Sequence, residues 1–273
     1  MHECRARGRF RLDKITPLVG DVVDFSGQSD ETHGFIEEIH ERKNVLVRPP
    51  VANIDNLVIV LSASKPEPDL LLVDKLILHA EINNIMPVLC LNKIDAVKKP
   101  ETAEDYREQY SCYPFSVVSA SNNTGLGSLE EILKGKTSAF TGQSAVGKSS
   151  ILNVLGADLQ LKTDGLSKKT SRGKHTTRQS ELMYLNYLDA FVIDTPGFSI
   201  FDSIDLDETA LASYYREFLP YAGKCRFLSC LHANEPECAV KDAARAGNIH
   251  PKRYERYLEI LNLLKEKRSK KYD

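Results

Sequence analysis

The chain has 273 residues, 42% of them hydrophobic, and a formal net charge of −2. This length allows two or three domains, and no apolar run approaches the roughly 20 residues that a membrane span requires. The polar, basic start also differs from a secretory signal. These features exclude the usual membrane and secreted classes, so we expect a cytoplasmic protein with no membrane partner.

Positive charge is concentrated in three segments of this slightly acidic chain. Residues 1–14 hold five basic and two acidic residues, residues 162–178 hold six and one, and residues 252–273 hold eight and four. Separate basic segments suggest a polyanion partner such as RNA, although solvated surface is the alternative for each one. The candidate RNA contacts at the N-terminus are Arg5, Arg7, Arg9 and Arg11.

Residues 1–50 show short apolar segments separated by turn residues. Such segments predict a small β barrel or sandwich. An OB-type barrel fits the basic decoration, although the strand pattern alone does not separate it from an SH3-like barrel. Pro49-Pro50 marks the expected boundary of this domain.

From residue 51 to 203, apolar strands alternate with helices, which predicts a doubly wound α/β sheet. Near-continuous apolar runs are typical of strands that are buried on both faces. The expected strands are residues 56–62, 87–91, 115–118, 137–140, 181–185 and 191–193. Four helices are expected. The first begins after Asp69 as its N-cap, and the second spans residues 102–110. The third begins with a capping box at Ser128, and the fourth begins at Ser150.

Residues 142–149 have the pattern G-x-x-x-x-G-K-S between a predicted strand and a predicted helix. This is the context of a phosphate-binding loop, whose glycines let backbone N–H groups turn toward a phosphate. Lys148 would reach the outer phosphates and the Ser149 hydroxyl would bind Mg²⁺. The expected nucleotide contacts are Gly142, Gln143, Ser144, Ala145, Val146, Gly147, Lys148, Ser149 and Ser150.

Two further motifs indicate which base the nucleotide carries. Asn92-Lys93-Ile94-Asp95 follows a predicted strand, and its last carboxylate can accept hydrogen bonds from N1–H and the 2-amino group of guanine. Asn92 would fix the loop and Lys93 would cover the base. Ser119-Ala120, at the next strand end, would supply a backbone N–H to the guanine carbonyl. Adenine offers no matching arrangement.

Two segments are expected to contact the γ-phosphate and its Mg²⁺. In Asp194-Thr195-Pro196-Gly197, Asp194 would hold Mg²⁺ through water and the Gly197 N–H would bind the γ-phosphate. Thr176 or Thr177, in a basic loop, would close on Mg²⁺. Each motif alone is a common turn, but all of them at strand ends of one domain predict GTP binding.

The motifs occur in an unusual order, with the base-binding segments before the glycine loop. The same sheet forms if the original termini are joined and the chain is reopened after the D-x-x-G element. We therefore expect a circular permutation, in which the γ-phosphate segment runs directly into the C-terminal domain.

Residues 204–273 are expected to form a helical domain, with helices at residues 208–218 and 251–267. Between them, four residues offer a complete tetrahedral set for one structural Zn²⁺: Cys225, Cys230, His232 and Cys238. The alternative is three free thiols and a surface histidine.

With these motifs, the chain resembles the bacterial ribosome small subunit-dependent GTPase A family of circularly permuted GTPases. Further matches are Cys4-Arg5-Ala6-Arg7-Gly8, Val19-Gly20-Asp21, Arg48-Pro49-Pro50 and Gly173-Lys174-His175-Thr176-Thr177-Arg178. The resemblance implies an OB-fold, a permuted GTPase domain and a zinc-binding helical domain. It also implies slow GTP hydrolysis to GDP that the small ribosomal subunit and its rRNA stimulate, late maturation of that subunit, and release of assembly factors. Family members carry another strand before the first motif, so we expect an incomplete barrel here; we also expect a monomer.

The residue after D-x-x-G is Phe198, which cannot orient water as the glutamine of Ras-like GTPases does. We therefore expect slow intrinsic hydrolysis, with His175 as the candidate catalytic residue once a partner orders residues 162–178. Two alternatives remain open. One is a P-loop ATPase or kinase, and the other is an RNA-binding or ribosome-binding zinc module with a largely non-catalytic GTP-sensing domain.

Overall fold

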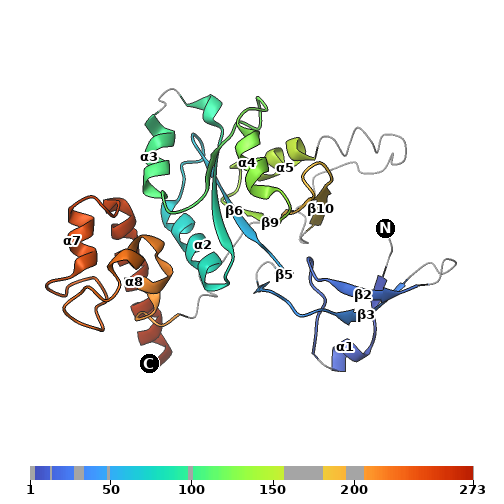
Figure 1. The fold of residues 1–273 in the computed structure, drawn as a ribbon, viewed down its shortest axis with the longest axis horizontal. Helices are drawn as coiled ribbons and strands as arrows, with labels where there is room; N and C mark the ends of the chain where they lie inside the picture. The colour runs from blue at the N-terminus through green and yellow to red at the C-terminus, as the bar shows by residue number, and fades with distance from the viewer. Residues whose placement is uncertain are drawn as a thin grey trace.

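A computed structural model describes residues 4–12, 14–27, 34–47, 50–97, 101–156, 181–194 and 206–272. In Figure 1 an N-terminal β region, a central α/β sheet and a C-terminal group of helices follow one another across the molecule. The expected fold class is confirmed. The domain boundaries at residues 50 and 203 stay a prediction.

The N-terminal region is built from short strands. A three-stranded sheet has the order β1-β3-β2, in which β1 is parallel and β2 antiparallel to β3, and β4 pairs with β5. Its elements are β1 (Cys4–Ala6), α1 (Arg9–Leu12), β2 (Val23–Ser26), β3 (Gly34–Ile39), β4 (Val45–Leu46) and β5 (Val51–Ala52). The sequence analysis missed β1, α1 and β5, because two- to four-residue elements carry too little periodicity to detect.

The central sheet has the strand order β10-β11-β9-β6-β7-β8. All neighbours are parallel except the edge strand β10, which is antiparallel to β11. The strands are β6 (Asn56–Ser62), β7 (Met86–Asn92), β8 (Phe115–Val117), β9 (Thr137–Thr141), β10 (Glu181–Leu185) and β11 (Ala190–Asp194). This mixed sheet confirms the predicted strands and brings the carboxyl ends of β6, β7, β8, β9 and β11 to one edge.

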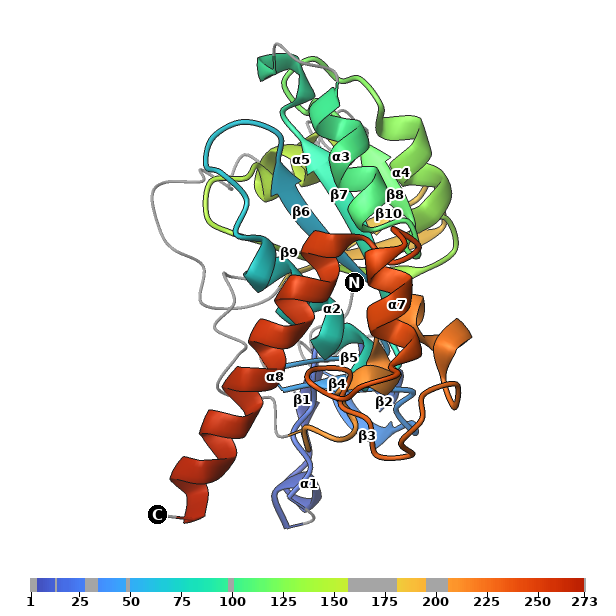
Figure 2. The same cartoon turned by 90° about the vertical axis from the view of Figure 1, so that its left-hand side faces the viewer.

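Helices cover both faces of the sheet, as Figures 1 and 2 show. The helices are α2 (Leu70–Ile82), α3 (Glu101–Gln109), α4 (Leu126–Leu133) and α5 (Lys148–Leu155). Alternate β6 residues belong to two buried clusters, with Leu57 and Ile59 in the cluster that contains α2 and Val58 in the one that contains α4 and α5. Burial on both faces explains why these strands are continuous apolar runs.

The helix α4 begins at Leu126, after Gly125, so the predicted capping box at Ser128 is wrong. The Ser128 hydroxyl lies inside the helix and donates to the carbonyl oxygen of Gly125, 3.0 Å away. Gly125 has φ +76°, and a Cβ there would lie 2.1 Å from the Val117 carbonyl oxygen. The close approach of β8 to this turn sets the start of the helix.

The C-terminal region contains η3 (Leu211–Tyr214), η4 (Arg216–Tyr221), α7 (Ala239–Arg245) and α8 (Pro251–Tyr272). The predicted helix over residues 208–218 is therefore wrong. Tyr215 adopts an extended conformation (φ −103°, ψ 103°) that separates two 3₁₀ segments, and its ring is buried against Phe218 and Tyr257. Tertiary packing of this aromatic side chain overrides the helical pattern.

The larger buried cluster is shared by all three parts of the chain. It contains Leu46 and Val51 from the N-terminal region, Leu76 from α2, and Tyr215 and Tyr257 from the C-terminal region. The larger cluster therefore extends through all three parts, and the smaller cluster lies within the central part. No described helix is long and apolar enough to cross a membrane.

Candidate functional site

The glycine loop lies where β9 ends and α5 begins, at the expected edge of the sheet (Figure 1). Both glycines of this loop occupy positions where a side chain would clash with neighbouring atoms. Gly142 has φ +136°, and a Cβ there would lie 2.3 Å from the Val60 carbonyl oxygen. Gly147 has φ +98° and caps α5. The loop therefore passes close to β6, along a path that these two positions allow because they lack a side chain.

Lys148 begins α5, and its ammonium group bonds to the loop itself. Nζ donates to the carbonyl oxygens of Gly142 and Gln143, at 2.8 and 2.9 Å. Burial lowers the pKa of Lys148, and the nearby carboxylate of Asp194 opposes that shift. The strand end of β11 thus lies beside the glycine loop, as the permuted arrangement requires.

Asn92 joins the glycine loop to the second base-binding segment. Its amide nitrogen donates to the Val146 carbonyl oxygen at 3.0 Å, and its side-chain oxygen accepts from the Ala120 N–H at 3.1 Å. Its neighbour Lys93 donates to the carbonyl oxygens of Ala145 and Lys65, at 2.7 and 2.8 Å. Four segments that are far apart in the sequence are thereby held together.

Asp95 lies at the same edge, in the short helix η1 (Ile94–Ala96). Its carboxylate accepts from the hydroxyls of Ser119 at 2.6 Å and Ser121 at 3.0 Å. These bonds, with that of Ser119 the largest cause, lower the pKa of Asp95. A carboxylate has about four acceptor positions, so this one can also accept hydrogen bonds from a ligand. The Ser121 hydroxyl therefore helps to hold the Asp95 carboxylate, next to the predicted Ser119-Ala120 segment.

Not all of the predicted site falls within the described part of the chain. His175, Thr176, Thr177 and Gly197 lie outside the described residues, and so do the side chains of Arg9 and Arg11. Arg7 forms an ion pair with Glu37 and lies over the Phe35 ring at 5.6 Å. Arg5 belongs to β1, in the N-terminal sheet. The roles of all these residues stay predictions.

The four predicted zinc ligands come together in the C-terminal region. The ligand atoms of Cys225, Cys230, His232 and Cys238 all lie within 4.8 Å of one another. The Nδ1 atom of His232 is 3.5 Å from Cys225 Sγ and 3.4 Å from Cys238 Sγ. This Cys₃His cluster could hold a metal ion.

Contacts around the cluster fix the loop that carries it. His232 has φ +57°, and its carbonyl oxygen accepts from the Tyr254 hydroxyl at 2.6 Å. Both oxygens of Glu235 accept backbone N–H groups, from Leu231 and Ala233. The Tyr257 hydroxyl donates to the Leu231 carbonyl oxygen at 2.7 Å. The cluster is therefore held against α8, and such outer contacts orient metal ligands.

These features define a class of protein: a P-loop nucleotide-binding domain whose motifs occur in permuted order, followed by a region with a Cys₃His cluster. A family model described as RsgA GTPase matches residues 39–204, and one described as RsgA N-terminal domain matches residues 1–36. The chain is 47% identical over 272 residues to the small ribosomal subunit biogenesis GTPase RsgA of Caldanaerobacter subterraneus subsp. tengcongensis. That alignment covers 99% of this chain and 91% of the relative. The corresponding protein of Alkaliphilus metalliredigens is 44% identical, covering 98% and 92%.

Solved structures agree with these matches. YjeQ from Thermotoga maritima is 35% identical with a TM-score of 0.80, and covers 96% of this chain and 89% of its own. YloQ, described as a circularly permuted GTPase, is 35% identical with a TM-score of 0.79, covering 97% and 86%. The chain belongs to the RsgA GTPase family. The resemblance noted from the sequence motifs is confirmed.

Proposed function

We propose that the chain is a GTPase that assists late maturation of the small ribosomal subunit, with slow hydrolysis that the subunit stimulates. The relatives named as small ribosomal subunit biogenesis GTPases support this, at identities near 45% over almost the whole chain. The observation that carries the nucleotide assignment is Asn92, which joins the glycine loop to the Ser119-Ala120 segment. That link brings a phosphate cradle and a base-binding carboxylate into one site.

In this proposal the base is guanine and Asp95 selects it. The carboxylate is ionised near neutral pH, and the serine hydroxyls lower its pKa further, so it accepts from the two N–H donors that guanine presents. The Ser119 and Ser121 hydroxyls hold its orientation. Adenine lacks those donors and would leave the carboxylate without a hydrogen bond from the base, which is the main basis of selection at such sites.

The phosphates would lie in the loop of residues 142–149, at the start of α5. A Cβ would clash with the Val60 carbonyl oxygen at Gly142 and with the Asn92 amide at Gly147, so both positions favour the loop path that the G-x-x-x-x-G-K-S pattern predicts. The ammonium of Lys148, now on two loop carbonyl oxygens, would exchange them for phosphate oxygens. Mg²⁺ would be held by Ser149, by Asp194 through water, and by Thr176 or Thr177, and would supply charge neutralisation.

In this proposal, GTP hydrolysis is slow until the chain binds the small ribosomal subunit. Phe198 stands where a water-orienting glutamine would be, so the isolated chain lacks that contribution. His175 would position water, and the rRNA contacts would include Arg5, Arg7, Arg9 and Arg11. The three thiols and one imidazole suit Zn²⁺ in a closed, structural site. We place this activity, as a monomer, in the cytoplasm.

One assay tests the proposal against its alternatives. GTP and ATP turnover are measured with and without purified small ribosomal subunits, over a salt titration that exposes phosphate contacts. We expect slow GTP turnover that the subunits accelerate at low salt. Preference for ATP would instead indicate the ATPase or kinase class. Binding of subunits without any turnover would indicate a non-catalytic sensor.

A further inference from the structure

The helix α2 contacts the glycine loop at its first turn. The side-chain oxygen of Gln143 accepts from the Asp69 backbone N–H at 3.0 Å. Asp69 is the N-cap of α2, and its carboxylate accepts from the Leu72 N–H at 2.9 Å. The position of the first turn of α2 therefore depends on Gln143, a loop residue that is expected to contact phosphate.

Five residues further along, α2 is bound to the C-terminal region through a buried carboxylate. The side chain of Asp74 is fully buried, and its two oxygens form ion pairs with Arg253 and Arg256 of α8, both at 2.6 Å. The Tyr110 hydroxyl also donates to it at 2.8 Å. A buried ion pair holds its geometry firmly, because losing one partner leaves an uncompensated charge.

Arg253 extends this connection to η4. Its side chain is 2% exposed, and its guanidinium pairs with Glu217 at 2.7 Å. It also lies 5.2 and 4.9 Å from the ring centroids of Tyr110 and Tyr215, which are cation–π distances. One carboxylate of α2 thus orients both the long C-terminal helix and the segment that precedes the Cys₃His cluster.

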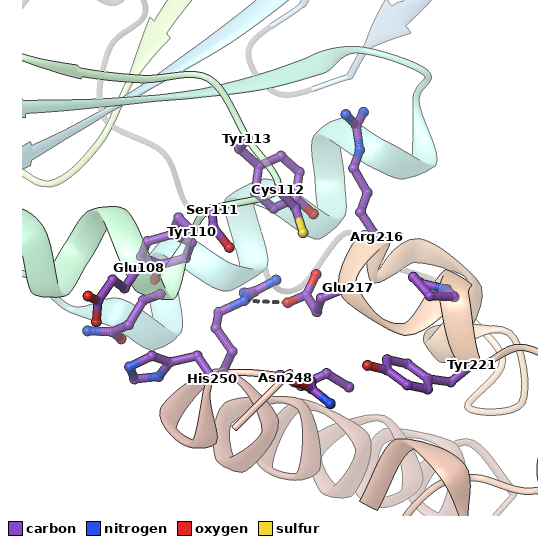
Figure 3. A pocket seen from close by; sticks show the side chains of 14 residues that line it. Glu108, Tyr110, Ser111, Cys112, Tyr113, Arg216, Glu217, Tyr221, Asn248 and His250 are labelled. Atoms are coloured by element: carbon purple, nitrogen blue, oxygen red, sulfur yellow. Dashed lines mark hydrogen bonds and ion pairs between the residues drawn. The ribbon is translucent and has the colours of Figure 1, made fainter. Parts of the chain in front are cut away.

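The same junction has unfilled space on its other side. A cavity of about 170 Å³ lies between the end of α3, η4 and the start of α8, and none of its lining residues belongs to the glycine loop. Figure 3 shows Tyr113, Glu217 and His250 around it. One polar atom of each has no hydrogen-bond partner among the described residues. The cavity is lined by Tyr110 and Arg253, two of the residues that contact Asp74.

We propose that α2 couples nucleotide binding to the C-terminal helical region, with Gln143 at one end of the connection and the Asp74–Arg253–Arg256 cluster at the other. The connection is separate from the covalent one through the chain after Gly197. A change in the glycine loop shifts Asp69 and hence the position of the buried carboxylate. The coupling is reciprocal, so contacts made by the C-terminal region change nucleotide affinity by the same factor. This inference rests on nucleotide binding at residues 142–149.

A double-variant cycle on the full chain tests this coupling. Gln143→Met keeps the side-chain length and removes the acceptor, and Arg256→Met leaves Asp74 paired with Arg253. Dissociation constants for GDP and a non-hydrolysable GTP analogue are measured for each single variant and for the pair. We expect the effect of the pair to differ from the product of the single effects by roughly threefold or more.

The matched control combines Gln143→Met with Arg245→Ala. Arg245 also forms an ion pair in the C-terminal region, with Asp242 at 3.1 Å, but both side chains are exposed and the pair lies within α7. In this control, the change in dissociation constant of the double variant should equal the product of the changes in the two single variants. Multiplicative behaviour in both pairs would overturn the proposal. Wild-type chain that binds neither nucleotide would overturn the proposed function, and this inference with it.

Hydrogen exchange gives an independent measurement if Arg256→Met unfolds. In the wild-type chain, GTP-analogue binding should slow amide exchange in α2 and in the first turns of α8 together. Exchange that changes only around residues 142–149 would contradict the coupling.

Discussion

Gly147 lies so close to Asn92 that a Cβ on the glycine would be 2.3 Å from the asparagine Nδ2 atom. That nitrogen donates to the neighbouring Val146 carbonyl oxygen. Because Gly147 has no side chain, the Asn92 amide can lie beside it. From there Asn92 links the glycine loop to the base-binding segments.

Gly147→Ala should reduce GTP affinity by roughly 100-fold, because strain at φ +98° and displacement of Asn92 act together. Titration with a fluorescent GTP analogue measures this. Gly135→Ala is the control: its φ is +68°, but nothing lies within 4 Å of the added Cβ. Equal loss of affinity in both variants would show that backbone strain, rather than the contact with Asn92, is responsible.

Asp95→Asn should weaken GTP binding on the order of 100-fold and give a preference for xanthosine triphosphate, because the amide can donate where the carboxylate accepted. Competition between the two nucleotides measures the preference. Asp207→Asn replaces another exposed aspartate that accepts from a neighbouring hydroxyl, that of Thr209, and should change neither affinity. An unchanged preference in Asp95→Asn would rule out guanine selection by this residue.

His175→Ala should lower the subunit-stimulated rate by roughly 100-fold while nucleotide affinity stays the same, because general positioning and proton-transfer roles contribute on that scale. Single-turnover hydrolysis with saturating small subunits separates the chemical step from binding. If stimulated turnover is preserved, another group orients the water.

Cys238→Ser should destabilise the chain by about 3 kcal/mol, since a structural zinc site contributes directly to folding. Cys238 is 2% exposed and caps α7 as well. We expect a thermal midpoint roughly 10 °C lower in calorimetry, and zinc content near zero. Cys112→Ser, at an exposed cysteine outside the cluster, should alter neither quantity.

The stability of the chain should fall as the pH drops below about 6.5, partly because of His79. Burial lowers the pKa of this histidine, so the native state keeps a neutral imidazole while the unfolded chain takes up a proton. Its contribution is present above 6.5 and is lost as the pH falls toward the folded-state pKa, at up to about 1.4 kcal/mol per pH unit. Urea unfolding of His79→Leu should show a shallower slope between pH 6.5 and 5. A slope equal to that of the wild-type chain would contradict this assignment.

Elements that express a simple pattern were predictable from the sequence. The run at residues 56–62 is β6 residue for residue, and Asp69 caps α2 as expected. The strands β1 and β5 and the break at Tyr215 were not predictable, because strand pairing and aromatic packing decide them. Ser128 failed as a cap for the same reason: the approach of Gly125 to Val117 fixes where α4 begins.

The sequence by itself determined the chemistry of this protein: the glycine loop, the carboxylate of Asp95, and three thiols with one imidazole within 14 residues. These depend on residue type and local spacing, which the sequence states directly. Only the tertiary structure decided which groups meet. Asn92 bridges two loops, Gln143 binds the cap of α2, and Asp74 pairs with arginines about 180 residues away. Such contacts depend on how the sheet and helices pack, and no local pattern records them.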